Sequence, residues 1–237
     1  MGQPAAAGQR WHALVSEPSP RGAAWLLLWL LRLASAFYFL AWVGYRALYG
    51  LALLRPLRLP CPVISIGNLT LGGSGKTTAV IGLAAWLRQQ GYRVAVLLRG
   101  YRGRRPHGTA LVSDGERLLM NLEQAGDEAI LLAQALPGVA VVVGKDRRRS
   151  ARLAIQQLGA NFLILDDGFQ YWRLQKDAEV LLWDATRPQH ALRLFPAGIL
   201  REPICALRRA THLWLTRSDL GGDTQALVQD LRRKSRL

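Results

Sequence analysis

A glycine-rich turn lies between an apolar run and a helix-forming segment, and its residues could hold phosphate. From Thr70 to Thr77 it reads Thr-Leu-Gly-Gly-Ser-Gly-Lys-Thr. Glycines let backbone N–H groups converge on an anion, and the next helix adds the positive end of its dipole. In such a P-loop, Lys76 contacts the outer phosphates of a nucleoside triphosphate and Thr77 binds Mg²⁺. The sequence therefore predicts a nucleoside triphosphate site made by Thr70, Leu71, Gly72, Gly73, Ser74, Gly75, Lys76 and Thr77.

The alternative is that this turn only connects a strand to a helix. The general P-loop pattern has glycine at position 70, where this chain has threonine. However, Lys76 is one of only four lysines among 31 basic residues. A lysine at the one position that needs it favours the nucleotide site.

Two adjacent carboxylates, Asp166 and Asp167, directly follow the apolar run 162–165. P-loop enzymes place an acidic residue for magnesium at the end of a strand beside the P-loop strand. One carboxylate would meet Mg²⁺, directly or through water, and the other would orient solvent or Lys76. The alternative is that these aspartates only begin a turn. We expect a magnesium site formed by Thr77, Asp166 and Asp167.

These side chains need a scaffold that brings them together, and the chain alternates strand and helix patterns. Strand-like runs occupy 62–66, 93–98, 139–143, 162–165, 180–183 and 212–215. Helical patterns occupy 76–90, a segment that ends at 136, and 146–158. Such alternation favours a parallel sheet with helices on both faces. We therefore predict an α/β domain of the P-loop NTPase type over residues 59–237.

Composition limits the partners of this domain. The 237 residues carry a net charge of +15 and half of them are apolar, which excludes a disordered chain. The charge calls for an anionic partner, such as nucleic acid, an acidic membrane surface or a phosphorylated substrate. Because no nucleic-acid-binding module or aromatic platform is recognisable, we expect no nucleic-acid partner. Cys61 and Cys205 lack metal-ligand spacing and are expected to be small core residues in a reducing, cytosolic compartment.

The N-terminal quarter is different, because residues 23–54 are nearly all apolar or aromatic. Only Arg32 and Arg46 interrupt this run. They lie close to four helical turns apart and so project from nearly the same face of a helix. Such a helix could lie among lipid headgroups, or insert with its arginines reaching each surface, or be a buried helix of the soluble fold. We predict that residues 1–58 form a membrane-associating helix and its linkers.

Several segments, in this order, resemble the tetraacyldisaccharide 4'-kinases of bacterial lipid A synthesis. They are 67–77, 99–101, 126–128, 143–147, Asp-Asp-Gly-Phe-Gln at 166–170 and the segment 196–203, which ends in Leu-Arg-Glu-Pro. The resemblance runs from the apolar helix to about Asp219. It implies a kinase that uses Mg-ATP to phosphorylate the 4'-hydroxyl of a tetraacyldisaccharide 1-phosphate. It also implies a glycolipid substrate and a place at the cytoplasmic face of the bacterial inner membrane.

The resemblance also assigns catalytic residues beside Lys76. Asp127 matches the carboxylate that acts as base on the acceptor hydroxyl, and Arg201 and Glu202 match active-site residues. From the residues alone, Asp127 could equally be a helix N-cap, and Arg201 and Glu202 a surface ion pair or cap. A basic loop suited to an anionic headgroup, or to solvent alone, contains Arg99, Arg102, Arg104 and Arg105.

Two departures from the family pattern bear on activity. Tyr171 stands where the family commonly has histidine, which leaves open any phosphate or metal contact from that position. Members of the family also usually continue well past residue 237. We therefore expect a fragment, a truncated product or a shortened relative, and the alternative function is a membrane-associated nucleotide-binding protein or ATPase without kinase activity.

Overall fold

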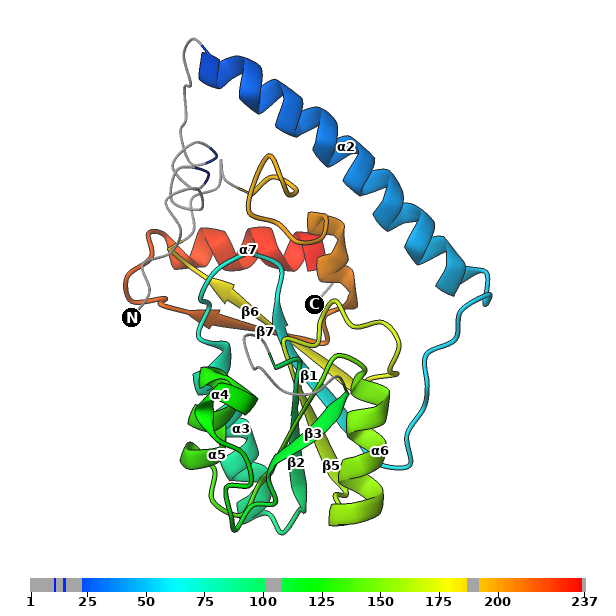
Figure 1. Cartoon of the computed structure of the whole chain (residues 1–237). Helices are drawn as coiled ribbons and strands as arrows, with labels where there is room; N and C mark the ends of the chain where they lie inside the picture. The colour runs from blue at the N-terminus through cyan, green and yellow to red at the C-terminus, as the bar shows by residue number, and fades with distance from the viewer. Residues whose placement is uncertain (1–10, 12–14, 16–22, 101–107, 187–191, 236–237) are drawn as a thin grey trace.

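A seven-stranded sheet with helices on both faces forms the body of the protein (Figure 1). The computed structural model describes residues 11, 15, 23–100, 108–186 and 192–235. The strand order is β3-β4-β2-β5-β1-β6-β7. The strands are β1 (Val63–Asn68), β2 (Val94–Leu98), β3 (Thr109–Ser113), β4 (Ala140–Gly144), β5 (Phe162–Asp166), β6 (Ala178–Asp184) and β7 (His212–Thr216).

The predicted α/β class is confirmed, with one correction to the purely parallel sheet. The edge strand β3, which the sequence patterns did not predict, pairs with β4 in the antiparallel direction. The other neighbouring strands pair in parallel.

Helices cover the two faces of this sheet. They are α3 (Lys76–Gln89), α4 (Leu122–Ala125), α5 (Asp127–Ala135), α6 (Arg147–Leu158), the 3₁₀ helix η2 (Ile204–Arg209) and α7 (Thr224–Ser235). In β5, Ile164 joins the cluster around α3 and α5, whereas Leu163 and Leu165 join the cluster on the α6 side. Strands buried on both faces need continuous apolar runs, which is why these segments could be recognised in the sequence.

The strand order brings the predicted site residues together. β1 lies between β5 and β6, with Ile66 opposite Asp166 in the parallel register. The carboxyl ends of parallel strands meet at one edge of a sheet, and ligands of open α/β sheets bind there. The glycine-rich turn after β1 and the carboxylates at the end of β5 therefore share that edge.

The N-terminal apolar segment forms one long helix, α2 (Ala23–Gly50), which crosses the molecule above the carboxyl edge of the sheet (Figure 1). The helical stretch Ala24–Gly50 is long enough and apolar enough to span a membrane. In its most apolar 18-residue part, 6% of the residues are buried. In the described part of the chain α2 is therefore not a buried core helix. The boundary predicted at residue 58 stays a prediction.

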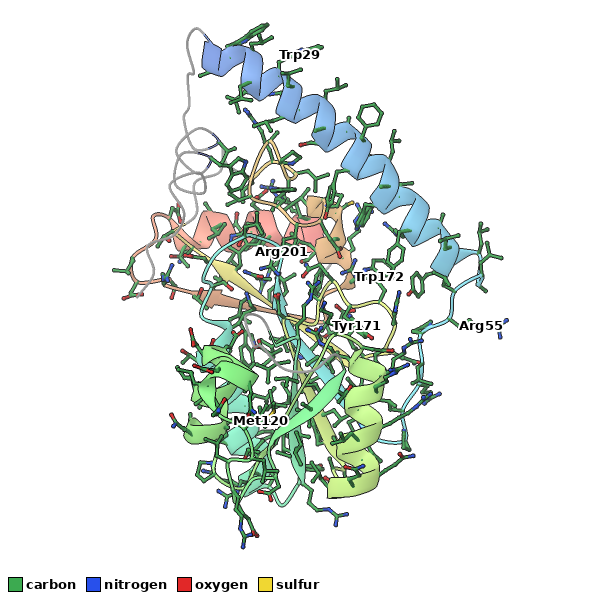
Figure 2. The ribbon with its side chains drawn as sticks, in the orientation of Figure 1. Trp29, Arg55, Met120, Tyr171, Trp172 and Arg201 are labelled. Atoms are coloured by element: carbon green, nitrogen blue, oxygen red, sulfur yellow. The ribbon has the colours of Figure 1, made fainter. Side chains whose placement is uncertain are left out.

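One side of α2 nevertheless touches the domain. The residues that make these contacts are spaced alternately three and four positions apart. They are Leu28, Leu31, Ser35, Tyr38, Trp42, Tyr45 and Tyr49. The remaining faces expose large apolar side chains, among them Trp29 and Phe37. Figure 2 shows Trp29 on the side of α2 away from the sheet and Trp172 between the helix and the domain.

The cysteines do not both lie in the core. Cys61 is half-buried and packs against the α6-side cluster, but Cys205 is exposed in η2. The expectation of two core cysteines is thus wrong for Cys205. Both are free thiols.

Candidate active site

The glycine-rich turn joins β1 to α3 as predicted and has the backbone of an anion cradle. Gly75 precedes Lys76 in the left-handed region (φ 79°), which disfavours any side chain there. Before the turn, near the end of β1, a Cβ on Gly67 would lie 2.5 Å from the Cβ of Phe169. Within the loop, the hydroxyl of Ser74 is buried and has no partner among the described residues. A ligand oxygen would satisfy it.

Lys76 reaches from the start of α3 back to the end of β1. Its ammonium donates a hydrogen bond to Asn68 Oδ1 at 3.1 Å and lies 3.5 Å from Asp167 Oδ1. The side chain is 12% exposed. The cation is therefore held at the mouth of the loop by protein oxygens, in the position of a phosphate-binding lysine.

Asp167 is held between two cations. Arg201 donates from one terminal nitrogen to both carboxylate oxygens, at 2.9 and 2.7 Å, while Lys76 approaches from the P-loop. Burial alone would raise the pKa of Asp167, but Lys76 and Arg201 together lower it below its usual value. Asp167 is ionised and joins the P-loop lysine to the arginine that the family resemblance singled out.

Asp166 has the opposite environment. It is 3% exposed and its Oδ1 has no hydrogen-bond partner in the described part of the chain. Burial raises the pKa of Asp166 to about 7, and the negative charges of Glu128 and Asp167 add to the rise while Lys76 opposes it. The two adjacent aspartates therefore differ, because Asp167 pairs with two cations whereas Asp166 pairs with no cation among the described residues.

These oxygens fit a magnesium ion. A cation beside Asp166 would satisfy its unpaired oxygen and relieve its repulsion from Glu128. Mg²⁺ prefers carboxylate and hydroxyl oxygens together with water and phosphate, and Thr77 supplies a hydroxyl at the start of α3. No group of three or more His, Cys, Asp or Glu side chains suited to a metal occurs among the described residues. The sequence patterns did not single out Glu128, although it adjoins Asp127.

This environment makes a prediction for stability. Between the unfolded pKa of 3.8 and the folded value of about 7, the folded state holds more protons on Asp166 than the unfolded chain does. In metal-free buffer, stability should therefore fall as pH rises across this window. Added Mg²⁺ should raise the melting temperature more at about pH 8 than at about pH 5, since protonated Asp166 binds a cation poorly.

Thermal melts of the wild type and Asp166→Asn, with and without Mg²⁺, check this. The variant should lose most of the pH dependence over that window. An equal Mg²⁺ shift at both pH values in the wild type would contradict the environment described for Asp166.

The other predicted catalytic residues occupy two different settings. Asp127 is exposed at the first position of α5, where the N-cap is Gly126 without a side-chain hydrogen bond. The N-cap alternative for Asp127 is thus not what the structure shows. Glu202 is buried and accepts from Arg209 at 2.6 Å, so a surface ion pair is also incorrect. The guanidinium of Arg209 lies 4.2 Å from the ring centres of both Phe169 and Trp172.

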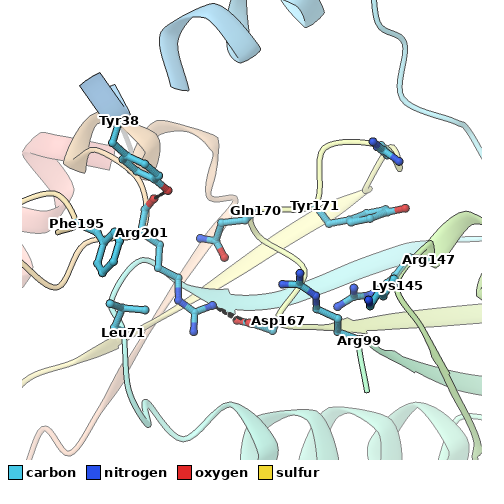
Figure 3. A pocket seen from close by; sticks show the side chains of 11 residues that line it. Tyr38, Leu71, Arg99, Lys145, Arg147, Asp167, Gln170, Tyr171, Phe195 and Arg201 are labelled. Carbon is cyan, nitrogen blue, oxygen red and sulfur yellow. Dashed lines mark hydrogen bonds and ion pairs between the residues drawn. The ribbon is translucent and has the colours of Figure 1, made fainter. Parts of the chain in front are cut away.

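A cavity of about 530 Å³ opens beside Asp167 (Figure 3). Of the predicted residues, Leu71, Asp167, Arg99 and Arg201 line it, whereas Asp127 and Glu202 are not among its described lining. Among its described lining residues, one carboxylate, that of Asp167, is set against five cations, namely Arg99, Lys145, Arg147, Arg173 and Arg201. Arg102, Arg104 and Arg105 of the predicted basic loop lie outside the described residues. The cavity suits an anionic ligand.

Tyr171 is part of the wall of this cavity. Its hydroxyl donates to Asp146 Oδ1 at 2.8 Å, and the guanidinium of Arg147 lies 5.4 Å from the centre of its ring. Asp146 caps α6 by accepting from the Arg148 N–H at 3.1 Å. Tyr171 therefore ties the loop after β5 to the turn that carries two of the cavity cations. In the described structure Tyr171 is therefore a structural tether.

Comparisons with known proteins agree with this geometry. The family model described as LpxK, tetraacyldisaccharide-1-P 4'-kinase, matches residues 27–235. The tetraacyldisaccharide 4'-kinase of Pelobacter propionicus is 45% identical over 207 residues, which cover 87% of this chain and 57% of that protein. The kinase of Geobacter sulfurreducens is 44% identical over 218 residues, covering 92% and 61%.

A solved structure extends the comparison to three dimensions. The crystal structure of LpxK from Aquifex aeolicus in complex with ATP aligns with a TM-score of 0.76 and 41% identity. The alignment covers 82% of this chain and 60% of that chain. The chain thus spans about three fifths of the length of these relatives. By its family-model match and by these identities, the chain belongs to the tetraacyldisaccharide 4'-kinase family.

Proposed function

We propose that this chain forms the phosphoryl-transfer site of a kinase that moves the γ-phosphate of Mg-ATP to the 4'-hydroxyl of a tetraacyldisaccharide 1-phosphate. One observation carries the proposal most. A P-loop lysine, an ionised aspartate and an arginine are linked at the rim of a cavity whose other charged residues, in the described lining, are basic. A nucleotide bound in the P-loop would direct its outer phosphate toward this basic cavity, where a second anion could bind.

On the nucleotide side, the backbone of residues 72–75 and Lys76 would hold the outer phosphates. Of the predicted ligands Thr77, Asp166 and Asp167, the first two would hold Mg²⁺ together with Glu128, and Asp167, paired with Lys76 and Arg201, would lie beside the ion. When bound, Mg²⁺ neutralises developing charge. The Arg201 guanidinium keeps an unpaired donor at Nε in the described structure. That donor can stabilise the charge spread over the transferred phosphoryl group, in addition to the contact with Asp167.

On the acceptor side, excess positive charge selects a phosphorylated molecule. Arg99, Lys145, Arg147 and Arg173 are among the described residues that line the cavity, and the carboxylate of Asp167 in the same lining pairs with Arg201 and Lys76. The acceptor of the family, a 1-phosphate, would bring negative charge to this basic lining. Asp127, exposed at the start of α5, would accept the proton of the acceptor hydroxyl.

Transfer of label tests the proposal directly. The full chain in mixed micelles would be incubated with γ-labelled ATP, Mg²⁺ and the tetraacyldisaccharide 1-phosphate. Label should move into the lipid fraction and should depend on the acceptor. ATP binding without any lipid labelling would reject the kinase in favour of a nucleotide-binding protein without transfer activity.

Tyr171 should control the acceptor rather than the nucleotide. Tyr171→Phe keeps the ring under Arg147 but removes the donor to Asp146. Losing one such hydrogen bond should raise the KM for the acceptor about three- to tenfold and leave the KM for ATP nearly unchanged. Steady-state kinetics with each substrate varied in turn measures both. A rise confined to the KM for ATP would contradict the placement of Tyr171 at the acceptor wall.

Membrane association would deliver this acceptor. We propose that the exposed apolar face of α2 binds the cytoplasmic surface of the bacterial inner membrane, where a glycolipid can enter the cavity without leaving the bilayer. The support is the length and apolar character of the helix and the position of Tyr38, from its domain-facing side, in the cavity wall. The exposed arginines of the same helix, Arg32 and Arg46, would favour anionic headgroups.

The outward face of α2 should therefore set membrane affinity without affecting the fold. Trp29, Phe37 and Leu40 are 51%, 65% and 63% exposed, so replacing all three by serine should barely change the melting temperature. Burying each in lipid is worth about 1.5 kcal/mol or more, so partitioning into vesicles should fall on the order of 10³-fold. Vesicle pelleting measures this, with Trp86→Ser on α3, 54% exposed, as the matched control. Unchanged pelleting of the triple variant would contradict the role given to this face.

A further inference from the structure

The domain-facing side of α2 is hydrogen-bonded to the segment that carries Arg201. Tyr38 donates from its hydroxyl to the main-chain carbonyl of Arg201 at 2.7 Å, the contact drawn in Figure 3. One turn earlier, the hydroxyl of Ser35 lies 2.9 Å from the carbonyl of Leu194 and accepts from the Ala197 N–H at 3.0 Å. These polar contacts are specific in direction and distance, unlike the apolar packing along the rest of the helix.

The same segment is attached to the P-loop on its other side. The N–H of Leu71 donates to the carbonyl of Ile199, and the N–H of Arg201 donates to the carbonyl of Leu69, each at 2.7 Å. Thr70 and Leu200 form the antiparallel bridge between these bonds. The main chain at Arg201 is therefore fixed from two directions, by the arm of the P-loop and by α2.

The side chain of Arg201 transmits this placement to the reacting groups. Its guanidinium is 2.7 Å from Asp167, and Asp167 is 3.5 Å from the ammonium of Lys76. A continuous path of polar contacts thus runs from a hydroxyl on α2 through Arg201 and Asp167 to the P-loop lysine. Phosphoryl transfer depends on the position of such charges, and small displacements of them are costly.

We infer that Tyr38 and Ser35 are positioning residues for Arg201, so that α2 is a working part of the phosphoryl-transfer site as well as an apolar surface. This inference rests on the proposed kinase activity. Neither residue touches the reacting atoms. They hold the peptide of Arg201 so that its guanidinium meets Asp167 and, during transfer, the phosphoryl group.

The helix supplies a matched control for this role. Tyr45 lies seven residues after Tyr38 on the same side of α2, but its hydroxyl bonds the hydroxyl of Tyr49 at 3.2 Å. Both Tyr→Phe changes remove one hydroxyl and keep one ring on the same helix. Only Tyr38→Phe breaks the contact with the segment of Arg201.

Steady-state kinetics of the full chain in mixed micelles gives the first test. Tyr38→Phe should lower kcat about three- to tenfold, the size expected for one neutral hydrogen bond, with little change in the KM for ATP. Tyr45→Phe should match the wild type. In an Arg201→Ala background, Tyr38→Phe should lower kcat no further, because the effects of two substitutions that act through the same group do not add. Wild-type kcat in Tyr38→Phe, or an equal loss in both backgrounds, would overturn the inference.

Hydrogen exchange gives a second test that does not need catalysis. Peptides covering 193–203 should exchange faster in Tyr38→Phe and in Ser35→Ala than in the wild type, and should be unchanged in Tyr45→Phe. Absence of label transfer in the wild type would reject the proposed function alone. Unchanged exchange of this segment in both Tyr38→Phe and Ser35→Ala would reject the positioning role.

Discussion

Replacing Lys76 by alanine should reduce phosphoryl transfer by about 10²–10³-fold or more while the protein remains folded. The ammonium of Lys76 is the one lysine cation at the mouth of the P-loop, where the outer phosphates of ATP would bind. The folded protein should tolerate the loss of this ammonium. Asp167 keeps its ion pair with Arg201 at 2.7 Å, and Asn68 keeps its hydrogen bond to the carbonyl of Gly72. Transfer rates and a melting curve measured on one preparation separate the two effects.

Lys234 offers a control of the same residue type. It pairs with Asp230 on α7, distant in sequence from the P-loop and outside the described walls of the cavity. Lys234→Ala should transfer phosphate at the wild-type rate. Full transfer activity in Lys76→Ala would contradict the assignment of residues 70–77 as a nucleotide-binding P-loop.

Asp127→Asn should lower kcat by about 10²–10⁴-fold and leave the KM for ATP nearly unchanged, because a general base acts on the acceptor proton only in the transition state. Asparagine has the same shape but cannot accept that proton. The structure removes the competing explanation of a lost helix cap, since Gly126 is the N-cap and makes no side-chain bond. The melting temperature should therefore stay near that of the wild type.

Glu123→Gln provides the comparison for Asp127→Asn. It neutralises another exposed carboxylate, in the first turn of the neighbouring helix α4. Equal small losses in both variants would indicate a general charge effect. Wild-type turnover in Asp127→Asn would exclude Asp127 as the base.

The strands and the main helices of the domain could be predicted from the sequence, because buried parallel strands need continuous apolar runs. The P-loop and the carboxylates after β5 were also visible, since strand ends beside one another must share an edge of the sheet. The edge strand β3 was not predicted. Three of its five residues are only partly buried, which removes the apolar contrast that marks the inner strands.

The different charge partners of residues adjacent in the sequence could not be predicted. Asp166 and Asp167 are adjacent in the sequence, yet among the described residues Asp166 pairs with no cation and Asp167 pairs with two. Arg201 and Glu202 likewise face different partners, one at Asp167 and the other at Arg209. Such differences arise from contacts between segments far apart in the chain.

The docking side of α2 was hidden for another reason. Its contact residues recur at spacings of three and four, as on any helix packed along one side. Because nearly every residue of α2 is apolar, the side that packs on the domain does not differ in polarity from the other sides, and the sequence does not reveal it. The hydrogen bonds of Ser35 and Tyr38 needed the three-dimensional position of the segment 194–201.

The position of the new phosphate tests the central claim most directly. The lipid product made by the wild-type chain from ATP and the tetraacyldisaccharide 1-phosphate would be isolated, and its phosphate esters located by magnetic resonance. The account predicts a new monoester at the 4'-oxygen, formed together with ADP and absent in Lys76→Ala. ATP consumed with release of inorganic phosphate alone, or a phosphate at a different hydroxyl, would contradict it.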